Sequence, residues 1–207
     1  MRVPQSIVNL GRWSRTDALV LQGLLGIVFV VQAILGMVIP LLGVVGVLDL
    51  ASSREVPVTG VAAPEFPDAD GVQLSASGSA ALTVDDPSFS QRVLLELPTI
   101  VGAVLILLGI YLLFRIARTL CLGDPFQPRN PLRLFGIAIL IAVGSVAASL
   151  LQAVTTDQLV AGTPLADHVP FSVEFSLLPL LVALLVAALA EAFRIGVRLR
   201  EDTEGLV

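Results

Sequence analysis

Four long apolar runs, separated by polar segments, dominate the pattern of hydrophobic and polar positions. The first extends from Ala18 to Leu48 without a charged residue, which corresponds to about 46 Å of helix against a hydrocarbon core of about 30 Å. Three further runs would form helices of about 31 to 35 Å, each long enough to cross a bilayer once. They cover residues 93–114, 134–154 and 171–193. The pattern predicts an all-α membrane protein with four transmembrane helices, organised as one domain over residues 1–207.

The last third of the first run contains Pro40, Gly43 and Gly46, which favour a kink or an early end of the helix. A cleaved secretory signal is the competing interpretation of this run. Because the apolar core of such a signal has only about 7 to 15 residues, and this run is about twice as long, we interpret it as a membrane span.

The segment between the first two spans, residues 49–92, is rich in prolines, serines, glycines and acids. Apolar and polar residues alternate on both sides of Gly78, and alternation with period two is typical of strands. The apolar positions are Val72, Leu74 and Ala76, then Ala80, Leu82 and Val84. We therefore predict a β-hairpin, which should pack on the first span, on Val56 and Val58, or on a second copy of the chain. Two roles stay open for it: a cap without a ligand, and a surface that senses or binds a partner.

Composition supports the membrane assignment and narrows the chemistry. Hydrophobic residues make up 56% of the chain and charged residues 14%, with a mean hydropathy of +0.92, which is too apolar for a soluble domain. The single cysteine and single histidine exclude a disulfide framework and the usual multi-histidine metal sites. The chain has no lysine, and it shows no nucleophile paired with a base. We expect no enzyme activity, no catalytic residue, no cofactor, no metal and no direct contact with nucleic acid.

The distribution of arginines predicts the orientation of the spans. Ten of the twelve arginines fall before the first span, between the second and third, or after the fourth. Only Arg54 and Arg92 fall on the other side, and cytoplasmic loops are the ones that carry excess arginine. We expect a multi-pass protein of the cell membrane with both termini in the cytoplasm and the segment 49–92 outside.

Three acids, Glu96, Glu174 and Glu191, lie near the ends of the spans. Acids within a bilayer are functional candidates by default, but within about one turn of a span end a carboxylate can reach water or headgroups. We expect the carboxylates of these three acids to reach water or headgroups in this way. Glu191 also has Arg194 three residues later, which predicts a local ion pair.

Helix contacts can be predicted for the second half of the chain. Small residues recur at four-residue spacing in the third and fourth spans, which favours packing of these two helices on each other. Oppositely charged pairs four residues apart predict that the fourth helix continues beyond the membrane before Gly205. The pairs are Arg198 with Asp202 and Arg200 with Glu204.

The loop between the second and third spans is the candidate interaction site. Asp124 and Asn130 can satisfy the free amides at a helix start, so capping alone would explain them. Phe126 either plugs the end of the helix bundle or contacts a partner protein. Arg129, which has other arginines nearby, meets either anionic headgroups or the same partner. The predicted interaction loop therefore consists of Asp124, Phe126, Arg129 and Asn130.

Two stretches, residues 123–130 (GDPFQPRN) and the tail 191–207, resemble a bacterial family of uncharacterised membrane proteins, domain of unknown function 2975. The resemblance extends in layout over most of the chain. It implies a four-span protein without assigned activity, often encoded beside a small helix-turn-helix regulator. A role in gene regulation or in a membrane stress response is what this resemblance implies.

Our leading hypothesis is a non-enzymatic membrane protein that acts in the lipid bilayer by protein–protein interaction, with a cytoplasmic regulatory protein as partner. The alternative is a transporter or channel component, and a membrane enzyme ranks third. A transporter needs a polar path, but the centre of each span carries no charge. A homo-oligomeric pore would avoid this objection, and homo-oligomerisation stays open.

Overall fold

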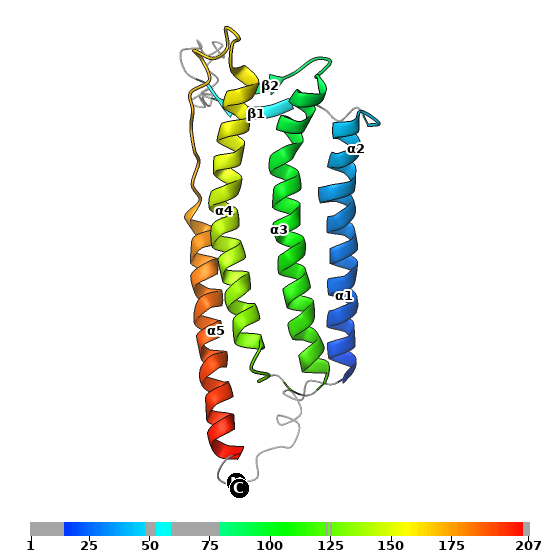
Figure 1. Ribbon diagram of the computed structural model, residues 1–207, viewed down its shortest axis with the longest axis vertical. Helices are drawn as coiled ribbons and strands as arrows, with labels where there is room; N and C mark the ends of the chain where they lie inside the picture. Colours follow the sequence, from blue (N-terminus) through cyan, green and yellow to red (C-terminus); the bar gives the residue numbers. More distant parts are fainter. Residues whose placement is uncertain (1–14, 49–52, 59–78, 123, 125, 205–207) are drawn as a thin grey trace, which may run out of the picture. The chain divides into compact units, whose positions relative to one another are not determined.

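The computed structural model describes residues 15–48, 53–58, 79–122, 124 and 126–204 (Figure 1). It confirms a mostly helical chain with a small antiparallel sheet between the first and second spans. In chain order the elements are α1 (Arg15–Ala33), the π-helix η2 (Ile34–Val38), α2 (Ile39–Val45), β1 (Ser53–Pro57), β2 (Ser79–Thr83), α3 (Phe89–Cys121), α4 (Asn130–Val160) and α5 (Leu177–Glu204).

Four helices within the described residues are long and apolar enough to cross a membrane. They are Leu19–Val45, Phe89–Cys121, Asn130–Val160 and Leu177–Thr203. Large apolar side chains point outward along them; Leu184 and Leu185, for example, are 67% and 71% exposed. Exposed apolar surface of this extent is stable only against lipid or another apolar partner. The chain is therefore a multi-pass membrane protein.

The first span is interrupted where its sequence suggested. The π-helix η2 immediately precedes α2, in which Pro40 occupies the first turn. A proline ring crowds the carbonyl four residues earlier, and a π-helical turn makes room for that clash. The span ends at Gly46, which adopts a left-handed conformation with φ of 79° and donates its N–H to the carbonyl of Gly43 at 3.0 Å. The predicted early end is confirmed.

The start of the fourth span was predicted wrongly. Helix α5 begins at Leu177, and residues 171–176 form no helix. In this stretch apolar Phe171, Val173 and Phe175 alternate with polar residues, which is the period of an extended chain and not of a helix. Pro179 in the first turn of α5 fits the start of a helix.

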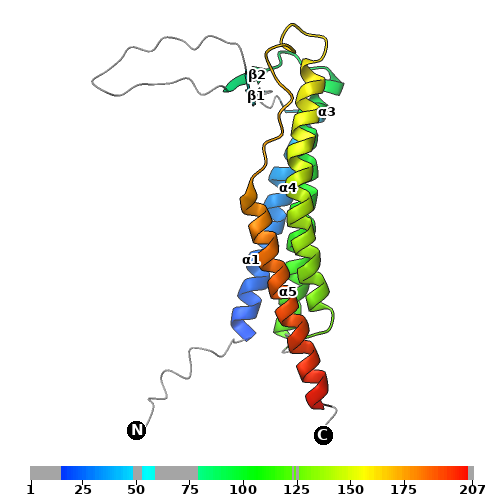
Figure 2. The ribbon, with the colours of Figure 1, turned by 90° about the vertical axis from the view of Figure 1, so that its left-hand side faces the viewer.

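The small sheet differs from the predicted hairpin in its pairing. Strand β2 covers much of the predicted second strand, but its described partner is β1, with Val56 opposite Ala80 and Arg54 opposite Leu82. Figures 1 and 2 show the two strands side by side. The predicted first strand, residues 72–76, lies outside the described residues. The predicted contact with Val56 is confirmed, because Val56 and Leu82 are buried in one apolar cluster.

The chain divides into two compact units, to which α3 and α4 both contribute. The sheet unit comprises Ile34–Val104 and Val143–Leu177, and the loop unit comprises Met1–Ala33, Leu105–Ala142 and Leu178–Val207. In the sheet unit, the core consists of Val56, Leu82, Leu159, Val160 and Val169. In the loop unit, Ile116 of α3, Leu134 and Ile137 of α4 and Ala190 of α5 form the core. Residues of the third and fourth spans thus share one cluster, in agreement with the predicted packing of the two helices, but the residues of the cluster are not the small residues on which that prediction rested.

Candidate functional site

The predicted interaction loop is joined to α5 by an ion pair. The carboxylate of Asp124 accepts a hydrogen bond from Nη1 of Arg200 at 2.5 Å, and the two side chains are 42% and 48% exposed. The backbone N–H of Asp124 donates to the carbonyl of Thr119. Asp124 was predicted to cap a helix, but its described side-chain partner is the arginine of α5. The structure thus connects the loop to the tail, two segments that the sequence analysis treated separately.

Phe126 rests on the same part of α5. Its ring centroid lies 5.8 Å from that of Phe193. A Cβ atom at Gly196 would lie only 2.6 Å from Cε1 of Phe126, so the absence of a side chain there allows the close approach. Phe126 is 41% exposed, which rules out the fully buried plug. One part of the ring packs on α5 and the other part is accessible.

Asn130, in contrast, is a buried structural residue. It is 0% exposed, and its Nδ2 donates to Oγ1 of Thr119 at 2.7 Å. Its Oδ1 accepts a hydrogen bond from Nη1 of Arg133 at 2.8 Å. Helix α4 does begin at Asn130 as predicted, but the bond to Thr119 joins α4 to α3. A partner protein cannot reach this side chain.

Arg129 is exposed and lies with Arg115 and Arg133 along a groove beside α3 and α4. Of the four predicted loop residues, Asp124 and Phe126 therefore face α5, Arg129 faces the groove, and Asn130 is interior. Phe193 and Gly196, on which Phe126 packs, were not among the residues predicted for the site. A signal was present, because residues 193, 196 and 200 are spaced to lie on one face of a helix.

Arg54 was counted only as a marker of topology, yet it joins β1 to α3 and α4. Its Nη1 donates to the hydroxyls of Thr155 at 2.8 Å and Thr156 at 3.0 Å. Its Nη2 donates to the carbonyls of Leu94 at 3.3 Å and Leu95 at 2.8 Å. Burial lowers the pKa of the Arg54 guanidinium, and the nearby carboxylate of Glu96 opposes this change. An arginine nevertheless stays charged at physiological pH.

The contact between Arg54 and α3 has a local cause in the sequence. In an α-helix the carbonyl of Leu94 would accept the N–H of residue 98, but that residue is Pro98, which has none. The carbonyl of Leu94 therefore needs another donor, and the guanidinium of Arg54 supplies it. A half-buried arginine in the sheet thus compensates for a proline inside a membrane span.

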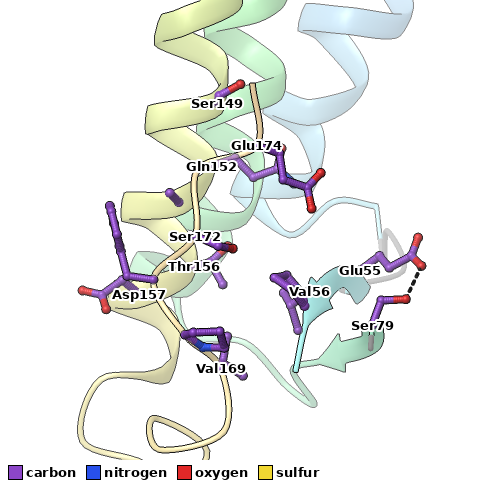
Figure 3. A pocket seen from close by; sticks show the side chains of 14 residues that line it. Glu55, Val56, Ser79, Ser149, Gln152, Thr156, Asp157, Val169, Ser172 and Glu174 are labelled. Carbon is purple, nitrogen blue, oxygen red and sulfur yellow. Dashed lines mark hydrogen bonds between the residues drawn. The ribbon is translucent and has the colours of Figure 1, made fainter. Parts of the chain in front are cut away.

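Two polar cavities lie in the sheet unit, and Gln152 lines both. The first, about 450 Å³, carries the carboxylates of Glu55, Asp157 and Glu174. Figure 3 shows Glu55 and Ser79 at the sheet, joined by a hydrogen bond of 2.9 Å, with Glu174 on the extended segment that precedes α5. This cavity is acidic, and its chemistry suits a cationic or strongly hydrated ligand.

The second cavity, about 510 Å³, is lined by charges of both signs. Its two arginines are already engaged: Arg54 as described, and Arg92 through a hydrogen bond of 2.9 Å from Nε to the carbonyl of Pro87. These bonds use both terminal nitrogens of Arg54 and the Nε of Arg92. Among the described residues, no group of three or more histidine, cysteine, aspartate or glutamate side chains could hold a metal ion.

The four apolar helices and the small sheet between the first two define the class, a multi-pass membrane protein. Within that class, the family model described as "Protein of unknown function (DUF2975)" matches residues 61–207. The chain belongs to this family, in agreement with the resemblance of its loop and tail. No curated protein and no solved structure matches the chain.

Proposed function

We propose that this protein is a non-enzymatic membrane protein that acts by binding a soluble protein on a loop–tail surface. This surface consists of Asp124, Phe126 and Arg129 of the loop, together with residues 193–204 of α5. Two contacts between the loop and α5 support the proposal. Asp124 forms an ion pair with Arg200, and the ring of Phe126 packs against Gly196. A loop held against a helix presents a pre-formed surface, which lowers the entropic cost of binding.

The length of α5 supports a surface that lies partly outside the bilayer. The helix has 28 residues. At 1.5 Å per residue it is about 42 Å long, about 12 Å more than the hydrocarbon core. In the proposed orientation Leu199 is in the protruding part. It is 62% exposed, and Phe126 and Arg129 are also accessible. Exposed aromatic and aliphatic residues flanked by arginines are typical of the anchors of protein interfaces.

The proposed orientation puts the loop–tail surface in the cytoplasm. Ten of the twelve arginines lie in the three segments that would be cytoplasmic, in agreement with the positive-inside rule. The partner would then be a cytoplasmic protein, and a small transcriptional regulator is the class that the family resemblance implies. Reporters fused after Val207 or within residues 122–127 should be cytoplasmic, whereas those near Gly71 or Gly162 should not. A periplasmic type of signal at Val207 would contradict the orientation.

Site-specific crosslinking tests the binding proposal in the cells that make this protein. Photoreactive amino acids at Arg129 and at Leu199 should capture one and the same soluble protein. The same probe at Leu184, which faces outward within the span, is the matched control and should capture none. The variant Gly196→Ala should abolish capture at Leu199. Different products at the two positions, or unchanged capture in the variant, would rule out the loop–tail surface.

Transport by the single chain receives less support. Residues 18–48, 97–114, 134–156 and 178–190 contain no charged side chain, so the middle of each span offers no ionic path. Genomic neighbourhood distinguishes the two functions cheaply: an adjacent regulator gene favours partner binding, and an adjacent ATPase or permease gene favours transport.

A further inference from the structure

A groove of about 390 Å³ in the loop unit combines positive charge with apolar walls. Its charged side carries Arg115, Arg129 and Arg133, and its apolar side is formed by Leu112, Leu132 and Gly136. Leu132 is 73% exposed, so it offers much of its surface to a ligand. Arg115 lies in the last two turns of α3, Arg129 immediately precedes α4, and Arg133 lies in the first turn of α4. Arginines at the ends of apolar helices are positioned to meet lipid headgroups.

Two of the arginines are held in position by other polar groups. Arg115 donates from Nη1 to the hydroxyl of Tyr111 at 2.8 Å, and its guanidinium carbon lies 5.7 Å from the centroid of that ring. Arg133 donates to Oδ1 of the buried Asn130 at 2.8 Å and to the carbonyl of Arg115 at 3.3 Å. Their side chains are therefore ordered before any ligand binds, which distinguishes this groove from a diffuse basic surface.

The described residues that line the groove include three guanidinium groups and no carboxylate. Arg133 experiences the positive charges of both Arg115 and Arg129. Ion pairs occur elsewhere among the described residues, between Glu191 and Arg194 and between Asp124 and Arg200. Like charges in proximity repel each other, so an anion that enters the groove gains more attraction than it would at a balanced surface.

We propose that this groove binds the phosphate of an anionic phospholipid. Guanidinium groups form paired hydrogen bonds with phosphate oxygens. Beside them, Gly136 has no side chain, and together with Leu112 and Leu132 it leaves an apolar path for an acyl chain. A soluble phosphate would use only the arginines, whereas a lipid uses both sides of the groove. The site goes beyond the loop–tail surface and shares only Arg129 with it.

The test uses the full chain purified in a non-ionic detergent, with binding followed by native mass spectrometry. Phosphatidylglycerol should bind as a discrete adduct, whereas phosphatidylcholine and inorganic phosphate should bind much more weakly. Arg115→Gln and Arg129→Gln should each weaken phosphatidylglycerol binding about fivefold. Arg118→Gln is the matched control, because Arg118 is an exposed arginine of the same helix outside the groove, and it should leave the affinity unchanged.

Three results would overturn the proposal. Equal binding of phosphatidylcholine would show that charge is not recognised, and inorganic phosphate that competes at equal concentration would show that the apolar wall is not used. An equal loss in Arg118→Gln would show general attraction to the basic face. Arg133→Gln would also remove a hydrogen-bond partner of Asn130. The test therefore uses the substitutions at Arg115 and Arg129. Since Arg115 is not part of the loop–tail surface, lipid binding and partner capture can fail independently.

Discussion

The ring of Phe126 lies against Gly196, where a Cβ atom would stand 2.6 Å from Cε1 of the ring. Gly196→Ala should therefore move the ring, because its exposed part can swing outward more easily than helix α5 can shift. We expect a changed ¹⁹F resonance for fluorinated Phe126 and a loss of stability below about 1 kcal/mol. The matched control is Gly23→Ala, since nothing lies within 4 Å of a Cβ at Gly23. An unchanged resonance in Gly196→Ala would contradict this packing.

Removal of the ring itself should have a moderate effect. Truncation of a fully buried phenylalanine costs about 3 to 5 kcal/mol, but Phe126 is 41% exposed. We expect Phe126→Ala to lower the free energy of unfolding by about 1 to 2 kcal/mol, as measured by denaturation in detergent. A loss of more than about 3 kcal/mol would contradict the partial exposure of the ring, because such a cost is typical of a fully buried phenylalanine.

The Asp124–Arg200 ion pair should affect mobility more than stability. Both side chains are nearly half exposed, and exposed pairs contribute about 0 to 1 kcal/mol. Asp124→Asn should leave the unfolding midpoint almost unchanged but increase the motion of a spin label at Leu199. Glu191→Gln is the control, because it breaks an exposed pair within α5 and leaves the loop contact intact. A label equally mobile in the parent chain and in Asp124→Asn would show that the loop does not order the tail.

The spans and the small sheet could be predicted from the sequence because each depends on a local pattern. Charge-free apolar runs identify helices in lipid, and Gly46 with Pro40 identified the end of the first one. The helix predicted for residues 171–176 was wrong because that prediction rested on the number of apolar residues and not on their spacing. The alternation of Phe171, Val173 and Phe175 with polar residues was visible in the sequence.

The contacts that order the site could not be predicted, because they join residues far apart in the chain. Asp124 and Arg200 are separated by 76 residues, and each had a plausible local partner or role that concealed the real one. The pairing of β2 with β1 is a similar case, since a strand with one apolar face can pair with any strand of matching pattern. Arg54 is a further case, since its partners on α3 and α4 lie 40 or more residues away in the chain.

Gly46 should tolerate substitution poorly. Its φ of 79° disfavours any residue with a Cβ, and such an atom would also collide with the guanidinium of Arg92. Gly46→Ala should therefore destabilise the chain by about 1 to 2 kcal/mol in thermal unfolding. Gly23→Ala, in the interior of α1 with open space around it, should be neutral or stabilising by up to about 1 kcal/mol. Equal effects of the two substitutions would show that the left-handed cap does not matter.

The link between Arg54 and Pro98 gives the sharpest test of the fold. Arg54→Met keeps an unbranched apolar side chain but removes the donors to Thr155, Thr156 and the two carbonyls of α3, so we expect a loss of about 2 to 3 kcal/mol. Pro98→Ala restores a backbone N–H that can bond the carbonyl of Leu94 within the helix. In that background the loss of stability caused by Arg54→Met should be about 1 kcal/mol smaller. The loss should be reduced equally in a Pro98→Val background, because valine also supplies the N–H. Unfolding in detergent measures all these variants as a double-mutant cycle. An equal loss in every background would mean that Arg54 stabilises the chain through the threonines and the carbonyl of Leu95. The carbonyl of Leu94 would then need no donor from the sheet.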